Sequence, residues 1–232
     1  MKWRAVCAAA GRALLPPTCV VCGGFGGDGL DLCADCRADL PWNQDACRRC
    51  GLPLAGPEPV CGLCRLAPPP LQRVQCALRY EFPVDRLLPR LKFHGDLAAG
   101  AVLATLAHWT LDPQDRPQAL VPVPLHPARL RQRGYDQALE LARRLARLGG
   151  LPVRADALRR VRATAAQTRL DAAARQRNLQ AAFAVRAGVT LPAHVALVDD
   201  VMTTGATLQA AALALRRAGV GRVDAWVCAR VG

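Results

Sequence analysis

Residues 195–208 read Val195-Ala-Leu-Val-Asp199-Asp200-Val-Met-Thr203-Thr204-Gly205-Ala206-Thr207-Leu208. Four apolar residues lead into two carboxylates, a Thr/Gly loop and an Ala/Leu-rich helical pattern over residues 206–218. An apolar run without polar alternation is typical of a strand buried on both faces of a parallel sheet. A loop from such a strand into a helix, with Thr204 or Gly205 as N-cap, puts free amides where anions bind. The stretch therefore predicts a phosphate monoester site, with two carboxylates that suit sugar hydroxyls directly or through a metal.

The same stretch resembles the phosphoribosyl pyrophosphate (PRPP) motif of type I phosphoribosyltransferases, in which an apolar run, two acidic residues and a Thr/Gly loop follow one another. The resemblance implies that Asp199 and Asp200 hold the 2′ and 3′ hydroxyls of the ribose. It also implies that the 5′-phosphate lies in a loop made of Thr203, Thr204, Gly205, Ala206 and Thr207. A buried strand with an Asp cap and an ordinary turn is the plainer alternative.

Positive charge gathers in one part of the chain. The formal net charge of the 232 residues is +13 at pH 7, and residues 129–186 carry 14 basic and 4 acidic side chains, or +10. A positive field focused on one region attracts polyanions such as pyrophosphate, nucleotides or nucleic acid. A solvated arginine-rich surface is the alternative. No apolar run approaches the length of a membrane span, so we expect a cytoplasmic protein without membrane insertion.

Eight of the 11 cysteines form four Cys-x-x-Cys pairs at a constant spacing of 14 residues. Two such pairs supply the four thiolates of one zinc ion, and a closed set of four is typical of a structural site. We expect a double zinc ribbon with two zinc ions and sequential pairing, although the spacing also allows interleaved pairing. A disulfide cluster is the alternative, and it suits secreted proteins. The eight predicted ligands are Cys19, Cys22, Cys33, Cys36, Cys47, Cys50, Cys61 and Cys64.

The chain divides into four predicted segments. Residues 1–18 form a helix and lead-in, 19–66 the double zinc ribbon, 67–71 a Pro-rich linker and 72–232 an α/β domain. Because the ribbon has few apolar residues, we expect metal to supply its folding energy.

Hydrophobic patterning predicts the elements of the α/β domain, which we expect to be a mainly parallel sheet flanked by helices. The expected strands cover residues 74–82, 119–124, 195–198 and 222–230, and the expected helices cover residues 84–93, 97–111, 131–148 and 206–218.

Polar residues elsewhere in the domain predict the rest of an anion site. Lys92 is its only lysine and is a candidate phosphate contact, although a helix C-terminus favours a cation in any case. The loop after the strand at 119–124 resembles the pyrophosphate loop of type I phosphoribosyltransferases. Its candidates are His126, which instead suits a capping role, and Arg129, Arg131 and Arg133.

Residues 158–183 are dense in cations and resemble the flexible loop that closes over PRPP in this fold. Its candidate residues are Arg162, with a catalytic role, and Gln167 and Arg175. Closure keeps water away from the ribose C1′ while its bond breaks. An exposed basic loop followed by a helix is the alternative.

Together, the motifs resemble those of the ComF family. They are a double zinc ribbon, Leu-Lys92-Phe-His94-Gly, Val-Pro-Val-Pro-Leu-His126-Pro-x-Arg129, Arg133-Gly-Tyr135-Asp-Gln and the Asp199-Asp200 stretch, with Asp136 where the family pattern has Asn. The resemblance implies a type I phosphoribosyltransferase-like fold that binds PRPP and magnesium and acts in natural competence or the use of external DNA.

The resemblance also implies transfer from PRPP to an unidentified acceptor. Implied partners are single-stranded DNA, through residues 129–186, and a competence helicase or uptake proteins. The alternative is a non-catalytic, PRPP-responsive accessory factor that binds single-stranded DNA.

Overall fold

A computed structural model describes residues 16–56, 58–161 and 182–232. The predicted N-terminal helix and the candidate residues Arg162, Gln167 and Arg175 lie outside these ranges. Within the described ranges, every helix is too short or too polar to cross a bilayer.

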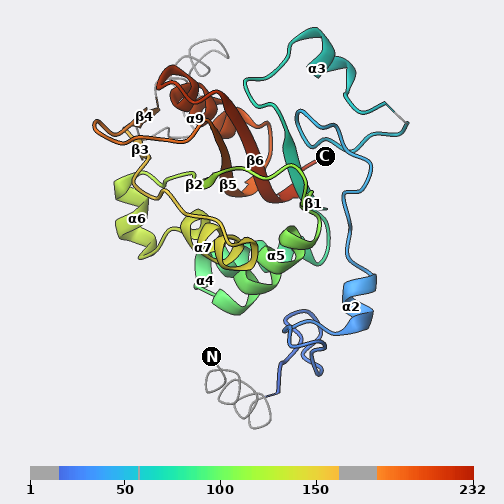
Figure 1. The fold of residues 1–232 in the computed structure, drawn as a ribbon. Helices are drawn as coiled ribbons and strands as arrows, with labels where there is room; N and C mark the ends of the chain where they lie inside the picture. The colour runs from blue at the N-terminus through green and yellow to red at the C-terminus, as the bar shows by residue number, and fades with distance from the viewer. Residues whose placement is uncertain (1–15, 57, 162–181) are drawn as a thin grey trace, which may run out of the picture.

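The centre of the fold is a parallel sheet of four strands in the order β1-β6-β5-β2 (Figure 1). The strands are β1 (Val74–Arg79), β2 (Ala119–Pro122), β5 (His194–Met202) and β6 (Arg222–Arg230). All the pairings between these neighbours are parallel, as expected when each strand returns to the sheet through a helical connection. The predicted mainly parallel sheet is confirmed.

Helices cover both faces of this sheet (Figure 1). α4 (Val84–His94), α5 (Leu97–Trp109) and α7 (Gln137–Gly149) share one hydrophobic cluster with the sheet. α9 (Ala206–Arg217) packs within a second cluster on the opposite face. The prediction that helices flank the sheet is also confirmed.

β5 shows why its sequence favours a strand with both faces buried. Ala196 and Val198 belong to the cluster of α4, α5 and α7, whereas Val195 and Leu197 belong to the cluster of α9. All four side chains are at most 1% exposed. Because side chains alternate between the faces of a strand, a run without polar residues fits a strand that is covered on both sides.

The segment after β2 differs from the prediction of one helix over residues 131–148. A short helix, α6 (Pro127–Arg133), ends at Gly134, which has a left-handed φ of 83°. α7 begins only after Asp136, whose carboxylate caps it by accepting a hydrogen bond from a backbone N–H of its first turn. The capping carboxylate and the left-handed glycine together make two helices out of the predicted one.

Residues 158–185 contain a strand pairing that the sequence prediction missed. β3 (Leu158–Arg160) pairs antiparallel with β4 (Phe183–Val185). Leu158 and Phe183 are buried in the cluster of α9. The prediction of a loop over residues 158–183 is therefore wrong at both ends, because apolar anchors fix these positions to the sheet.

The second half of the double zinc ribbon lies beside the β1 edge of the sheet, whereas its first half lies beyond α5 (Figure 1). Backbone hydrogen bonds join residues 41–48 to β1. The Asn43 N–H donates to the Ala77 carbonyl at 3.0 Å, and the Arg79 N–H donates to the Pro41 carbonyl at 2.8 Å. An edge strand presents unpaired backbone groups, so this segment satisfies groups that β1 would otherwise expose.

Several apolar side chains of the ribbon are buried against the α/β part of the chain. Leu30, Leu32 and Leu40 are at most 8% exposed and join the cluster of α4, α5 and α7. The ribbon thus shares a core with the α/β part, and the supply of its folding energy by metal stays a prediction. The division of the chain at residues 67–71 stays a prediction.

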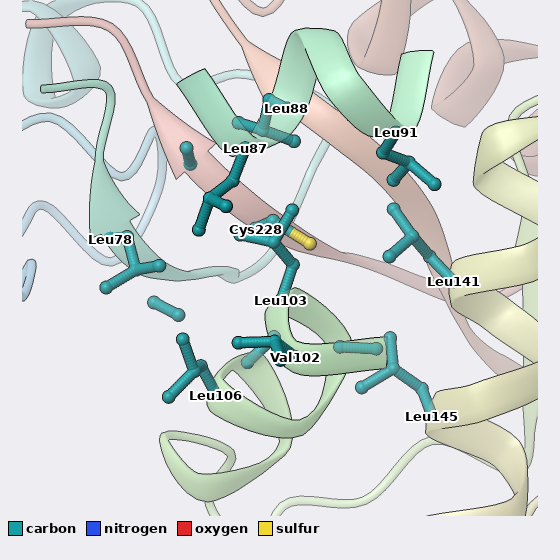
Figure 2. Close-up of a cluster of buried hydrophobic side chains, with 14 of the residues drawn as sticks. Leu78, Leu87, Leu88, Leu91, Val102, Leu103, Leu106, Leu141, Leu145 and Cys228 are labelled. Carbon is teal, nitrogen blue, oxygen red and sulfur yellow. The ribbon is translucent and has the colours of Figure 1, made fainter. Parts of the chain in front are cut away.

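Figure 2 shows the cluster between the sheet and the helices, in which Leu103 of α5 lies among Leu87, Leu106 and Cys228. Leu103 is fully buried. We predict that Leu103→Ala lowers the free energy of unfolding by about 2–5 kcal/mol, because a cavity adds to the lost burial.

Urea denaturation of the zinc-loaded protein measures this change. Leu97→Ala in the same helix is the matched control, because Leu97 is 58% exposed. The control should change the free energy by no more than about 0.5 kcal/mol. Equal effects of the two substitutions would contradict the assigned core.

Candidate functional site

A cavity of about 390 Å³ lies at the carboxyl ends of the four parallel strands, and we call it the first cavity. Ligands of open α/β sheets bind at this edge. Seven residues that the sequence analysis proposed for PRPP line it: Lys92, Arg129, Arg133, Asp199, Asp200, Thr203 and Thr207. The fold thus brings together residues that are more than a hundred positions apart in the sequence.

The two adjacent carboxylates lie on β5. The Asp199 carboxylate accepts a hydrogen bond from the Asp200 N–H at 2.9 Å, and the Asp200 carboxylate accepts one from the Val201 N–H at 3.0 Å. The Lys92 Nζ lies 3.2 Å from Asp200 Oδ2. Burial and the charge of Asp200 together raise the pKa of Asp199 well above its usual range. The raised pKa favours the neutral acid at Asp199, and a cation bound beside the pair would favour its charged form.

Asp200 lies within a strand and is buried, whereas the sequence predicts a strand that ends at Val198. β5 continues to Met202, and Asp200 is only 3% exposed. β6 runs alongside this extension, with Met202 opposite Arg230 in register. The added length of β5 carries Asp200 into the protein, where Lys92 of α4 is its partner.

The loop between β5 and α9 depends on Gly205. This residue has a φ of 79°, and a Cβ atom on it would lie 2.4 Å from Cε of Met202. The Thr204 hydroxyl accepts a hydrogen bond from the Ala206 N–H at 3.4 Å. The amides of the first turn of α9 have no acceptor within the helix, and Thr203 and Thr207 line the first cavity beside them. The arrangement suits an anion.

Cationic side chains from two further elements line the first cavity with the carboxylates. Arg129 and Arg133 come from α6, and Arg160 comes from the end of β3. The Arg133 guanidinium lies 5.5 Å from the centre of the Phe93 ring and donates to the Gln137 side chain. Burial lowers the pKa of Arg160, and nearby Arg129 lowers it further. With Lys92, four cations surround two carboxylates, so the first cavity favours an anion.

Three residues that the sequence did not indicate also line the first cavity, namely Arg160, Tyr80 and Gln137. Arg160 lies in a run of arginines whose members cannot be told apart without the β3–β4 pairing. Tyr80 follows β1 directly, and the end of a parallel strand is the one signal that would have indicated it.

Other predicted PRPP residues do not line the first cavity. Thr204, Gly205 and Ala206 form the backbone of the loop beside it. His126 caps α6, since its Nδ1 accepts a hydrogen bond from the Ala128 N–H at 3.3 Å. Arg131 is exposed on α6. Direct contact of these five residues with PRPP stays a prediction. The contact that His126 makes is the helix cap that the sequence offered as the alternative.

At the opposite edge of the sheet, Asp115, His194 and Asp224 form a cluster with the composition of a metal site. Arg222 lies 2.7 Å from Asp115 and 2.8 Å from Asp224, and His194 lies 2.8 Å from Asp224. The hydrogen bond from Arg222 lowers the pKa of Asp115 to about 2. Because arginine already neutralises these carboxylates, the cluster is an ion-pair network at the start of β5 and β6.

The ribbon cysteines form two sets of four. One set is Cys19, Cys22, Cys33 and Cys36, and the other is Cys47, Cys50, Cys61 and Cys64. The ligand atoms within each set lie within 4.8 Å of one another. The Cys-x-x-Cys pairs therefore combine sequentially, and not in the interleaved order that their spacing also allows.

Both sets fit zinc. A tetrahedral ion with Zn–S bonds of about 2.3 Å places its sulfur atoms about 3.8 Å apart. The Cys22 and Cys33 Sγ atoms are 3.8 Å apart, and so are those of Cys50 and Cys61. Each set has one ligand in a short helix. Cys36 of the first set lies in α2 (Ala34–Ala38), and Cys64 of the second set lies in α3 (Gly62–Leu66). All four positions of each ion are filled by protein, so the sites are structural.

We predict about two zinc equivalents in protein purified without added metal, as measured by elemental analysis. Cys22→Ser should leave about one equivalent, because one of the two closed sets loses a ligand. Cys76→Ala is the control, since Cys76 is a buried residue of β1 outside both sets, and it should retain both ions. Metal-free protein with four disulfides by mass would contradict the assignment.

Comparisons with known proteins agree with both parts of the chain. The double zinc ribbon domain family matches residues 10–65. The DNA utilization protein YhgH of Salmonella typhimurium is 36% identical over 205 residues, which cover 86% of this chain and 90% of the relative.

Two further relatives extend this likeness. The DNA utilization protein YhgH of Escherichia coli K12 is 34% identical, and Competence protein F of Haemophilus influenzae is 33% identical, each over 86% of this chain and 90% of the relative. Such coverage includes the ribbon and the α/β part alike. The chain belongs to the ComF family, that of Competence protein F.

Proposed function

We propose that this protein binds PRPP with magnesium in the first cavity and acts in DNA uptake or in the use of external DNA. The observation that carries the proposal is the meeting of two carboxylates, two threonine hydroxyls and four cations in one cavity at the carboxyl edge of a parallel sheet. Relatives named DNA utilization protein and Competence protein F support the DNA-related part.

Each group of side chains suits one part of PRPP. Asp199 and Asp200 accept hydrogen bonds from the ribose hydroxyls. The Thr203 and Thr207 hydroxyls and the first-turn amides of α9 bind the 5′-phosphate. The cations Lys92, Arg129, Arg133 and Arg160 bind the pyrophosphate through charge-assisted hydrogen bonds.

Magnesium fits this donor set. Mg²⁺ keeps several waters and is bound through one or two carboxylates plus the phosphates of a substrate. Asp199 offers a carboxylate at the first cavity, and a bound cation would favour its charged form despite its raised pKa. When bound, magnesium supplies charge neutralisation to the phosphates.

The catalytic part of the proposal is transfer of ribose 5-phosphate from PRPP to an acceptor, with release of pyrophosphate. The bond between C1′ and the pyrophosphate oxygen breaks, and the pyrophosphate leaves with the electron pair. Lys92 and the three arginines stabilise the negative charge that grows on the leaving group. Arg162, Gln167 and Arg175 are proposed to exclude water from this step.

The second candidate is an accessory factor that binds PRPP without turnover and holds single-stranded DNA through residues 129–186. The +10 charge of that region favours this candidate, because counterion release drives binding to nucleic acid. A competence helicase or uptake proteins would be its partners. Thiolate zinc sites suit a reducing compartment, so we propose a cytoplasmic location for both candidates.

We predict that PRPP with magnesium raises the melting temperature of the protein by mass action. Ribose 5-phosphate should raise it less, because it lacks the pyrophosphate. Asp199→Asn should weaken binding by about 10- to 150-fold, since it removes charge-assisted hydrogen bonds worth about 1.5–3 kcal/mol. Calorimetry measures the affinity directly and needs no acceptor.

Asp45→Asn is the matched control for this experiment, because Asp45 is exposed on the ribbon and the charge change is the same. It should leave PRPP binding unchanged. Wild-type protein that does not bind PRPP would rule out both candidates. Binding without pyrophosphate release, across bases, amines and DNA, would favour the accessory factor.

We predict that single-stranded DNA binds with little sequence preference and that its affinity falls steeply with salt. Arg131→Glu combined with Arg147→Glu should weaken binding and reduce the salt slope, because both side chains are exposed in the basic region and neither lines the first cavity. Fluorescence anisotropy at several salt concentrations measures both effects. Arg216→Glu with Arg217→Glu, exposed at the end of α9, is the control of equal charge. An affinity that does not vary with salt would contradict the electrostatic basis.

A further inference from the structure

A second cavity of about 450 Å³ adjoins the first. Pro124, Leu125 and Arg160 line both cavities, so β3 and the start of the loop after β2 separate them. None of the proposed PRPP contacts apart from Arg160 lines the second cavity. Its volume lies within the range of about 300–1,000 Å³ that is typical of small-molecule sites.

The wall of the second cavity combines an apolar side with a charged side. Four leucines and one tyrosine make the apolar side. They are Leu125 of the loop after β2, Leu130 of α6, Leu139 of α7, Leu158 of β3, and Tyr135 of the turn between α6 and α7. Leu130 is 40% exposed, although it lies in a helix beside this apolar surface. An exposed leucine in a cavity wall suits a ligand with an apolar body.

The charged residues at the second cavity leave it positive. Arg159 and Arg186 are exposed at its rim, and neither forms an ion pair with any residue that the structure describes. The acidic groups are already engaged. Glu140 lies 2.7 Å from Arg143, and the Asp136 carboxylate accepts hydrogen bonds from two backbone N–H groups at 3.0 and 3.2 Å. A ligand that reaches the rim therefore meets two uncompensated guanidinium groups.

We propose that the second cavity binds a nucleotide, with its base and sugar against the leucine wall and its phosphate on Arg159 and Arg186. Arginine suits phosphate because its planar fork donates two parallel hydrogen bonds. The nucleotide is either free or one unit of a single strand, and both sources share this chemistry. The choice of a nucleotide over other anions with an apolar body rests on the proposed role with DNA.

The test uses the zinc-loaded full chain and a fluorescent oligothymidylate, with binding followed by anisotropy. Arg159→Gln combined with Arg186→Gln should weaken binding about tenfold or more. Arg216→Gln with Arg217→Gln is the matched control, because both residues are exposed at the end of α9 and the charge change is equal. The control should weaken binding less than about twofold, as expected of distant exposed charges that salt screens.

A second variant tests the cavity itself rather than its charge. Leu130→Trp fills the apolar wall from a partly exposed position, so the fold should tolerate it. It should weaken oligothymidylate binding at unchanged net charge. Displacement of the oligonucleotide by thymidine monophosphate would assign the free nucleotide, and its failure to compete would assign the single strand.

Two results would overturn the proposal. One is an equal loss in the Arg159/Arg186 and Arg216/Arg217 variants, since net charge alone would then explain binding. The other is full binding by Leu130→Trp. The PRPP-induced change in melting temperature is measured on the same proteins. It separates this proposal from the PRPP assignment, because neither Arg159, Arg186 nor Leu130 lines the first cavity.

Discussion

The ion pair between Asp200 and Lys92 is the constraint on which the site depends. An isolated carboxylate in a protein interior costs several kcal/mol, and Asp200 is only 3% exposed. Along β5, Asp200 alternates in phase with Ala196 and Val198, so it points to the face covered by α4, α5 and α7. Lys92 near the end of α4 lies 3.2 Å away and compensates it. This contact joins α4 to β5 and sets the charge at the buried end of the site.

The zinc sites act on the same sheet from its open edge. β1 has β6 on one side only, and residues 41–48 of the ribbon satisfy its other side. Cys47 lies within this segment and Cys36 lies shortly before it. The two cysteines belong to different zinc sets. Zinc bound at both sets would add to the buried leucines of the ribbon in holding this segment against β1. Metal binding at the ribbon therefore stabilises the strand from which Tyr80 reaches the first cavity.

Local sequence patterns were sufficient for β5, α9 and the cysteine sets, because each pattern carries its own physical reason. The apolar run requires cover on both faces, and Gly205 marks the left-handed residue before the helix. The sequence did not predict β3 and β4, which are three residues each and pair across a long separation. It also missed Arg160, whose role depends on that pairing. Lys92 was a candidate from its rarity, but its partner Asp200 required the tertiary structure.

Arg160 connects the chemistry of the two cavities. Its side chain lines both of them, so an anion in either cavity interacts with the same guanidinium. If both cavities hold anions near Arg160, these share one cation and repel each other across it. Such coupling is reciprocal. PRPP in the first cavity would then weaken nucleotide binding in the second, and a bound strand would weaken PRPP binding, without any overlap between the two ligands.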